Sequence, residues 1–391
     1  MKSYDVVIVG AGPAGSSCAI GCARKGLSVA LIEKLDHPRV KVCGGGVVQR
    51  AYDACPVNID AAISHKVSVI DLVWHRSQMV VTAKQDKPII YMVQRKNLDK
   101  LLFEAAKQEG VDYYPNTTVL DITQTDERVH LLIGERALSA KWLVGADGAS
   151  GTTSKLAGWR KIKKMQSPAI DAEVVLTKSL AATLNKTRFD FDVVKSGYGW
   201  VFPKGDHLSI GLGIFQSLNS HKNTVSLPQL LNDYLTFLGI TTKDIVSIKK
   251  KGFVIPTNYM TEGVSKGRVL LVGDAAGLAD PLTAEGISAA IISGKLAAEA
   301  IIKAKHSQMS AGKVYQTMLE DELLIDLRVS EKLSRLLYKH TRITQLILRA
   351  RQKKATRVIS KIFTGETRFS QLTKNASLLR RGLFYLLSGA S

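Results

Sequence analysis

The sequence predicts a mixed α/β (α+β) fold with three parts: a Rossmann-like dinucleotide-binding domain, an antiparallel-sheet domain inserted into it, and a basic helical C-terminal region. Three observations support this prediction. A G-x-G-x-x-G motif follows an apolar run at the start of the chain, short alternating runs fill residues 169–255, and residues 327–363 contain neither proline nor glycine. A chain of 391 residues is long enough for two domains and a substantial core.

The glycine-rich motif predicts a dinucleotide site. Residues 5–9 are typical of a buried parallel strand, and residues 16–25 can form a closely packed helix whose N-terminus would face phosphates. Between them, Gly10 permits a tight turn, Gly12 lets a pyrophosphate approach the backbone, and Gly15 lets the helix pack against the strand. The complete motif is Gly10, Ala11, Gly12, Pro13, Ala14 and Gly15.

A second apolar run, residues 28–32, ends in Glu33. An acid at this place in a βαβ unit accepts hydrogen bonds from the adenosine ribose, which favours FAD or NAD over NADP. Because strand, glycines, helix, second strand and acid occur in this order, a chance glycine turn is the weaker interpretation.

Two further segments could approach a ligand. Cys43 precedes Gly44 and Gly45 in a loop over residues 35–46, and such glycines permit the backbone to lie flat against a ligand. The alternative is a flexible loop with an incidental thiol. Arg95 begins a helix expected over residues 94–108 and could reach a phosphate or a ribityl hydroxyl, or could be a surface arginine.

Two later strand ends present backbone at the carboxyl edge of the expected sheet. Apolar runs at residues 138–143 and 269–272 lead into two Gly/Asp turns, where α/β folds bind ligands. A helix expected from about residue 284 to residue 305 could direct its positive end toward N1 and O2 of a flavin. The residues concerned are Asp147, Gly148, Gly273, Asp274, Pro281, Gly286 and Ile287.

We expect the dinucleotide-binding domain over residues 1–66, 94–166 and 267–306, and the antiparallel-sheet domain over residues 67–93 and 167–266. Tyr198, Trp200 and Phe202 alternate along one expected strand and so share a face. This aromatic wall is either ordinary core or one side of an apolar substrate cavity.

The composition bears on metal binding, membrane insertion and cellular location. The four cysteines form no C-x-x-C pair, so we expect neither a metal site nor an iron–sulfur cluster. No apolar run approaches the roughly 20 residues of a membrane span. The first strand begins almost at the N-terminus, which leaves no room for a signal peptide and favours a cytoplasmic location.

The net charge of +20 is concentrated toward the C-terminus. We expect the basic helical C-terminal region over residues 307–391. Residues 327–363 interleave leucine and isoleucine with arginine and lysine, which predicts one or two basic amphipathic helices, and a short apolar end follows at residues 378–387. These helices are either a cap on the antiparallel-sheet domain or a peripheral attachment to anionic membrane. Ferredoxin is another anionic partner that a basic surface could bind, whereas no recognisable module supports nucleic-acid binding.

Three segments together resemble the FAD-binding set of the para-hydroxybenzoate-hydroxylase-like flavoproteins: residues 10–15, 145–148 and 273–277. The Cys43 loop and residues 198–203 are similar to the corresponding segments of one branch, the geranylgeranyl reductases. The resemblance covers about residues 2–302. It implies that the three segments meet at one FAD, that Cys43 lies beside the isoalloxazine, and that the aromatic strand lines a lipid pocket.

The resemblance implies an FAD-dependent oxidoreductase that saturates carbon–carbon double bonds of a polyprenyl substrate by hydride transfer from flavin N5. Cys43 is then the candidate residue that positions or protonates the substrate. Flavin-dependent monooxygenases or halogenases, acting on an aromatic or lipophilic substrate, and electron-transfer flavoprotein dehydrogenases share the scaffold. The halogenase strand Trp-x-Trp-x-Ile-Pro is not reproduced, since Tyr198 and Phe202 replace its ends. The sequence leaves NAD(P)H and ferredoxin open as electron donors, because no second nucleotide motif is present.

Overall fold

A mixed, eight-stranded sheet gathers strands from distant parts of the chain around the glycine-rich motif. The computed structural model describes residues 1–159, 166–215, 225–258, 262–307 and 309–374. In the sheet β1 lies between β2 and β11, and β18 pairs with the far side of β11, all in parallel. The strands are β1 (Lys2–Val9), β2 (Val29–Ile32), β8 (Asp112–Tyr114), β9 (Val119–Gln124), β10 (Val129–Ile133), β11 (Arg136–Gly145), β17 (Ser265–Lys266) and β18 (Val269–Leu271).

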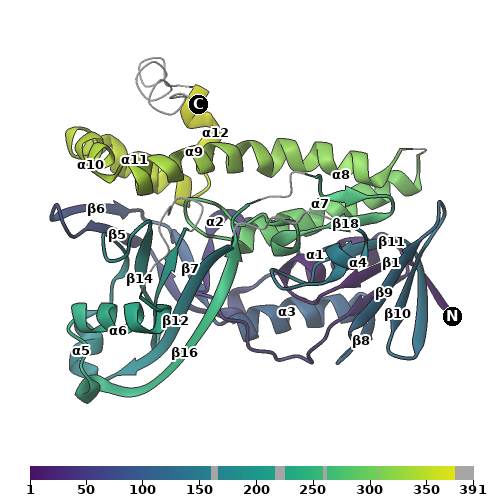
Figure 1. The fold of residues 1–391 in the computed structure, drawn as a ribbon, viewed down its shortest axis with the longest axis horizontal. Coiled ribbons are helices and arrows are strands. Elements are labelled where there is room, and N and C mark those ends of the chain that lie inside the picture. Colours follow the sequence, from purple (N-terminus) through teal and green to yellow (C-terminus); the bar gives the residue numbers. More distant parts are fainter. Residues whose placement is uncertain (160–165, 216–224, 259–261, 308, 375–391) are drawn as a thin grey trace.

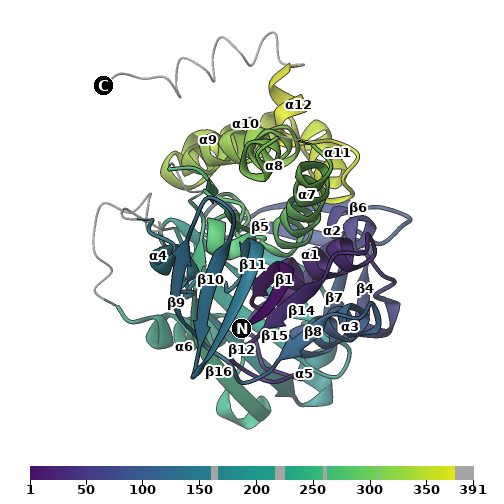
Figure 2. The same cartoon turned by 90° about the vertical axis from the view of Figure 1, so that its right-hand side faces the viewer.

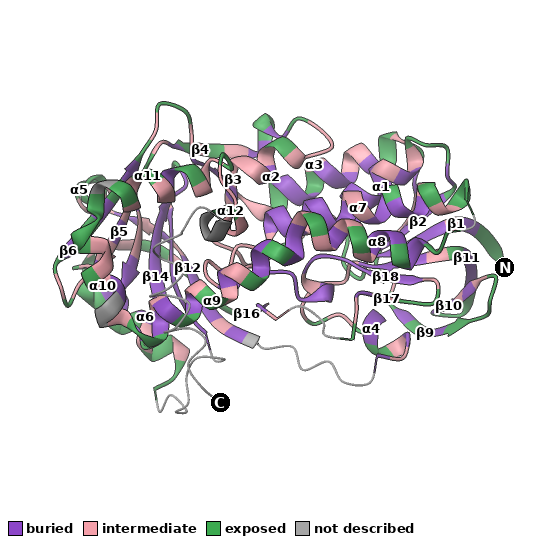
Figure 3. Ribbon diagram, turned by 90° about the horizontal axis from the view of Figure 1, so that it is seen from above, coloured by how far each residue is buried: buried purple, intermediate pink, exposed green. Residues whose placement is uncertain are grey.

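Small residues let two helices pack closely on this sheet. Helix α1 (Pro13–Ala23) is buried over most of its surface between the sheet and α7 (Ile287–Lys305), as the buried colouring of both helices in Figure 3 shows. A Cβ added to Gly294 would lie 2.2 Å from Ala14 O, and one added to Gly21 would lie 2.9 Å from the Ala298 Cβ. Larger side chains would therefore force the two helices apart.

Two predicted helices can be compared directly with the structure. The helix expected over residues 94–108 is confirmed as α3 (Arg95–Gln108). The helix expected from about residue 284 begins instead at Ile287. Ala284 adopts a positive φ of 56°, and its N–H donates to Asp280 O in a turn, so the helix cannot start there.

A second, seven-stranded sheet is antiparallel apart from the parallel pairing of β13 with β5. Its order is β16-β12-β15-β14-β13-β5-β6, and α6 (Leu227–Phe237) packs on one of its faces. The strands are β5 (Val69–Trp74), β6 (Met79–Lys84), β12 (Gln166–Leu176), β13 (Thr187–Phe191), β14 (Gly197–Pro203), β15 (Leu208–Ile214) and β16 (Ile245–Pro256).

A small sheet joins the two larger ones. Its strands are β3 (Gly46–Val48), β4 (Ile63–Val67) and β7 (Ile90–Val93), with β7 in the centre. The predicted loop over residues 35–46 thus ends in a strand, which leads into α2 (Gln49–Ala54). The short helices α4 (Thr153–Leu156) and α5 (Lys178–Thr183) complete these parts of the chain.

The C-terminal helices extend over both large sheets (Figures 1 and 2). Within the described residues 327–363, the prediction of one or two helices is wrong, because non-helical backbone at His340 and Arg351 divides the segment into three. The apolar end predicted at residues 378–387 lies outside the described residues. The helices are α8 (Ala311–Leu319), a π-helical turn (Glu320–Leu324), α9 (Ile325–Lys339), α10 (Thr341–Ala350), α11 (Gln352–Phe363) and α12 (Phe369–Lys374).

In the described part of the chain, no helix combines the length and the apolar composition needed to cross a bilayer.

The contact of α6 with the seven-stranded antiparallel sheet includes a buried charge. The Tyr234 hydroxyl donates to the fully buried Asp190 carboxylate, which also accepts from Arg188. We expect Tyr234→Phe to lower the free energy of unfolding by about 1.5–3 kcal/mol, because a hydrogen bond to a buried charge is lost. Urea unfolding of the full chain measures this.

The control is Tyr113→Phe, which removes a hydroxyl that donates to Asp36 near the surface, at 3.2 Å. We expect a change within about 0.5 kcal/mol for this variant. Equal losses in both variants would contradict the assignment of a stabilising role to the buried carboxylate.

Candidate active site

A cavity of about 1170 Å³ runs from the carboxyl ends of the parallel strands to the aromatic face of the antiparallel sheet. This volume exceeds the usual range of about 300–1,000 Å³ for a single small-ligand pocket. The cavity therefore has space for a long ligand, or for two ligands that meet.

The structure brings most of the predicted site residues to this one cavity. Gly15, Gly273 and Pro281 do not line it. The predicted residues that do line it are Gly10, Gly12, Pro13, Ala14, Glu33, Cys43, Gly44, Gly45, Arg95, Asp147, Gly148, Asp274, Gly286, Ile287, Tyr198, Trp200 and Phe202.

The glycines of the first motif form a cradle that side chains would fill. Gly10 has a φ of 105°, and a Cβ there would lie 2.3 Å from Ala146 O. A Cβ on Gly15 would lie 1.8 Å from Gly10 O, which agrees with the packing role predicted for this residue. At Gly12 the only neighbour within 4 Å of an added Cβ is Arg39 Nη2, at 3.2 Å, so the backbone there faces the cavity.

A charged network lies beside this cradle. Glu33 Oε2 accepts from Ala11 N–H at 2.9 Å and lies 3.4 Å from Arg39 Nε. Arg39 Nη2 is 3.3 Å from the carboxylate of Asp99, which is fully buried. Arg39 Nε is itself buried and has no hydrogen-bond partner among the described residues. Sequence reasoning missed Arg39, because it lies in a loop without a motif, although it stands next to the phosphate cradle.

Arg95 connects this network to the Cys43 loop. Its guanidinium binds Asp99 through two hydrogen bonds of 2.8 and 3.0 Å. Burial alone would lower the pKa of Arg95, but the adjacent Asp99 and Cys43 side chains raise it above its ordinary value. Arg95 is therefore a buried, permanently charged group beside the sulfur rather than a surface arginine.

The Cys43 loop packs directly against the aromatic strand. A Cβ on Gly44 would lie 3.0 Å from the Phe202 ring, and Gly45 has a φ of 73°. Gly45 N–H donates to the Cys43 sulfur at 3.4 Å. A side chain is excluded at Gly45, where an added Cβ would lie 2.1 Å from Val93 O, and would be tightly packed at Gly44, so the loop and the aromatic wall meet without an intervening side chain.

The other end of the cavity is apolar. Tyr198, Trp200 and Phe202 are buried side by side along β14, and the ring centroids of successive pairs are 6.2 Å apart. The opposite wall comes from α9, α10 and α11, which sequence analysis left without a role in a site. The apolar stripe of each amphipathic helix was the sequence feature that could have indicated this wall. Their lining side chains include Leu336, Leu337, Tyr338, Leu348, Ile359 and Phe363.

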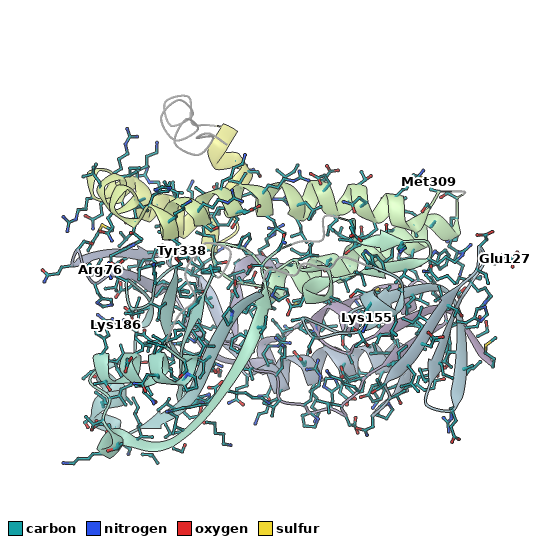
Figure 4. The ribbon with its side chains drawn as sticks, in the orientation of Figure 1. Arg76, Glu127, Lys155, Lys186, Met309 and Tyr338 are labelled. Atoms are coloured by element: carbon teal, nitrogen blue, oxygen red, sulfur yellow. The ribbon has the colours of Figure 1, made fainter. Side chains whose placement is uncertain are left out.

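Tyr338 joins this apolar wall to the other half of the cavity. Its hydroxyl donates to Leu282 O at 2.7 Å, and its ring stacks on Phe215 with centroids 4.6 Å apart. The Tyr198 hydroxyl donates to the neighbouring Thr283 O. The two tyrosines thus hold the turn before α7 from the helix side and from the sheet side; Figure 4 shows Tyr338 between these layers.

Three acidic side chains of intermediate exposure also line the cavity. Asp147 caps α4, since its Oδ2 atom accepts from Thr153 N–H and from the Thr153 hydroxyl, both at 2.8 Å. Asp280 and Glu285, which sequence reasoning missed, lie on the turn before α7 and line the cavity. Burial raises the pKa of both carboxyl groups. In the described residues, no group of His, Cys, Asp and Glu side chains could hold a metal ion.

The family model described as an FAD binding domain matches residues 3–304. The chain belongs to this family. It is an FAD-dependent oxidoreductase, as the three glycine-containing segments predicted, and FAD is its cofactor. The cradle at Gly12, the buried Arg39 guanidinium, whose Nε atom makes no hydrogen bond among the described residues, and the volume of the cavity fit this cofactor.

Comparison with individual proteins confirms the resemblance to the geranylgeranyl reductases. A digeranylgeranylglycerophospholipid reductase of Methanococcus vannielii is 30% identical over 320 residues, which cover 78% of this chain and 79% of that protein. A geranylgeranyl bacteriochlorophyll reductase-like protein of Thermoplasma acidophilum superposes with a TM-score of 0.79 over 99% of both chains, at 22% identity. A flavin-dependent brominase superposes with a TM-score of 0.74 over 96% of this chain and 98% of its own, also at 22% identity. At such identities the two solved structures show the shared fold alone.

Arg39 provides a test of the cofactor half of the cavity. We expect Arg39→Ala to weaken FAD binding by about 10- to 100-fold, which corresponds to about 1.5–3 kcal/mol for a lost hydrogen bond to a charged group. Titration of the apoprotein with FAD, followed by flavin fluorescence, measures the dissociation constant.

Arg24→Ala is the matched control. Arg24 is paired with Glu109 on the surface and does not line the cavity, so its loss should leave FAD binding unchanged. A normal FAD affinity in Arg39→Ala would show that Arg39 only neutralises the carboxylates of Glu33 and Asp99 and does not bind FAD.

Proposed function

We propose that the enzyme reduces carbon–carbon double bonds in the polyprenyl chain of a lipid-like substrate. The observation that supports this most strongly is the continuity of the cavity, which joins the glycine cradle to a long apolar chamber between β14 and the C-terminal helices. A polyprenyl chain is apolar and long, and the aromatic and aliphatic walls match it. The reductase relative from Methanococcus vannielii supports the same substrate class.

The cofactor site would be formed by residues from three distant segments. Gly12 and the N-terminus of α1 would face the pyrophosphate, Glu33 the ribose, and Asp274 the ribityl chain. The N-terminus of α7, at Gly286 and Ile287, would face the pyrimidine edge of the isoalloxazine. When bound and reduced, FAD supplies the hydride, at N5.

The chain's own residues would orient the substrate and supply a proton. The apolar walls exclude water and hold the alkene in one place, which matters because an isolated double bond accepts hydride poorly. The Cys43 thiol lies at the junction of the two halves of the cavity. It would hold the proton that reaches the second alkene carbon.

An anaerobic half-reaction tests this function. The purified enzyme is reduced with dithionite, which makes the choice between NAD(P)H and ferredoxin irrelevant, and is then mixed with geranylgeranyl diphosphate or a polyprenyl lipid. We expect reoxidation of the flavin together with a saturated product, and a reaction at least about tenfold slower in Cys43→Ser. Flavin absorbance and mass spectrometry of the product are the measurements.

The absence of a saturated product from every polyprenyl compound, with rapid turnover of an aromatic substrate in oxygen, would instead support the monooxygenase or halogenase class.

Filling the apolar chamber tests where the substrate binds. Ile359 lines the chamber from α11, so Ile359→Trp should slow the reduction of a long polyprenyl chain by about 10- to 100-fold, which corresponds to about 1–3 kcal/mol of overpacking. The measurement is the rate of flavin reoxidation at fixed substrate concentration.

Leu346→Trp on α10 is the control, because Leu346 is 70% exposed and lies outside the cavity lining. If both tryptophan variants react at the wild-type rate, the chamber is not the substrate site.

We further propose that the outer face of the C-terminal helices binds anionic membrane lipid, where a polyprenyl substrate would be found. This face carries exposed basic side chains on α10 and α11 together with the exposed Leu346. The opposite faces of the same helices line the apolar chamber, so a lipid bound outside would lie one helix layer from the site. The exposed basic residues are Arg349, Arg351, Lys354, Arg357 and Lys361.

Charge reversal tests the membrane proposal. We expect the triple variant Lys354→Glu, Arg357→Glu and Lys361→Glu to reduce co-sedimentation with phosphatidylserine vesicles by at least about tenfold, since each basic residue near an anionic surface contributes about 1 kcal/mol.

The matched control reverses three exposed lysines elsewhere, with Lys25→Glu, Lys100→Glu and Lys107→Glu, and has the same net charge. Equal losses in both triple variants would point to overall charge rather than to this face.

A further inference from the structure

A buried ammonium group lies behind the Cys43 loop, outside the lining of the cavity. Lys204 directly follows β14, and its side chain is 1% exposed. Its Nζ atom is 3.0 Å from Glu173 Oε1 and 3.1 Å from the position that a Cβ on Gly45 would occupy. Burying a lysine costs several kcal/mol unless the charge is compensated. Glu173 provides this compensation, so that a charged pair lies next to Gly45 behind the Cys43 loop.

The same lysine is connected to solvent through successive short contacts. Glu173 Oε2 lies 2.7 Å from His207 Nε2, and His207 Nδ1 lies 2.6 Å from Asp206 Oδ1. The Asp206 side chain is 83% exposed, whereas that of His207 is 12% exposed. The Glu173 side chain is 36% exposed, although its Oε2 atom, which faces His207, is buried. Titratable groups thus follow one another, each within contact distance, from the surface to Lys204 behind the Cys43 loop.

The charges along this line favour proton exchange. The contact with Glu173 raises the pKa of His207, so the imidazole is more readily protonated than an isolated histidine. Burial alone would raise the pKa of Glu173, but His207 and Lys204 lower it. Asp171, on the same strand as Glu173, is a further buried carboxyl, and burial together with Glu173 raises its pKa to about 6.

The inner end of the line meets Cys43 across a single glycine. A Cβ added to Gly45 would lie 3.1 Å from Lys204 Nζ, and the Gly45 N–H donates to the Cys43 sulfur at 3.4 Å. A side chain at position 45 would clash with Val93 O, at 2.1 Å from the added Cβ. The chain therefore keeps this place free of any group that would separate the ammonium from the sulfur.

We propose that Asp206, His207, Glu173 and Lys204 form a proton-supply path that restores the proton of the Cys43 thiol from solvent after each turnover. This inference rests on the proposed function. In each turnover the alkene is reduced: one carbon gains a hydride, with its electron pair, from the flavin, which is oxidised, and the other carbon gains the proton of the thiol. A proton from water at Asp206 then passes along the path to the sulfur.

The path predicts a difference between the first and the later turnovers. In His207→Ala, Cys43 is already protonated when the reaction begins, so the first turnover should proceed at the wild-type rate. Later turnovers should be at least about tenfold slower, because resupply of the proton limits them, and added imidazole should restore their rate. The experiment uses the FAD-loaded enzyme, dithionite and geranylgeranyl diphosphate in a rapid-mixing instrument.

His75→Ala is the matched control. His75 Nε2 lies 2.9 Å from the buried Asp190 carboxylate of the same sheet, and neither residue lines the cavity. This variant should lose a comparable histidine–carboxylate contact without an initial burst of product or rescue by imidazole.

A second measurement does not depend on turnover. In Glu173→Gln the His207 imidazole, which also faces Asp206 and Lys204, should titrate at lower pH than in the wild type, as followed by NMR of ¹⁵N-labelled histidine. An unchanged titration would show that the two groups are not coupled and would overturn the path.

The outcomes separate this inference from the proposed function. If the wild type yields no saturated product, both are wrong. If the wild type yields product and His207→Ala matches it in all turnovers, or slows the first turnover as much as the later ones, the path is wrong and the function stands.

Discussion

The close contact of α1 with the backbone around it is the constraint on which the rest of the structure depends. Added Cβ atoms at Gly10, Gly15 and Gly294 would each lie within 2.3 Å of a carbonyl oxygen. Because no side chain intervenes, the N-terminus of α1 reaches the carboxyl edge of the parallel sheet, where Ala146 and Asp274 also arrive. The phosphate cradle, the position of α7 and the opening toward the antiparallel sheet all follow from this packing.

The sequence predicts best those features that local chemistry determines. The glycine motif, the acid at Glu33 and the alternation of Tyr198, Trp200 and Phe202 each require one residue type at one spacing. The structure brings these segments to one cavity. For the same reason, the family resemblance could be stated from short motifs that lie far apart in the sequence.

What the sequence does not reveal depends on contacts between distant segments. Nothing near Arg39 indicates that its guanidinium lies between Glu33 and Asp99, because that position depends on how a loop folds over the sheet. The apolar stripes of α9 to α11 were visible, but a stripe does not specify whether it faces a membrane, a sheet or a cavity. The start of α7 at Ile287 also depends on distant segments, since Tyr198 and Tyr338 from other elements hold the turn that precedes this helix.

The second wall of the apolar chamber consists of residues near the end of the chain, as far as Phe363. During synthesis the FAD-binding segments are therefore complete, with α7 ending at Lys305, before the chamber has its covering helices. Until those helices have been synthesised, the aromatic face of β14 lacks the helices that cover it in the folded chain. A nascent chain thus passes through a stage in which this apolar surface is uncovered, and any factor that assists its folding has to act within that interval.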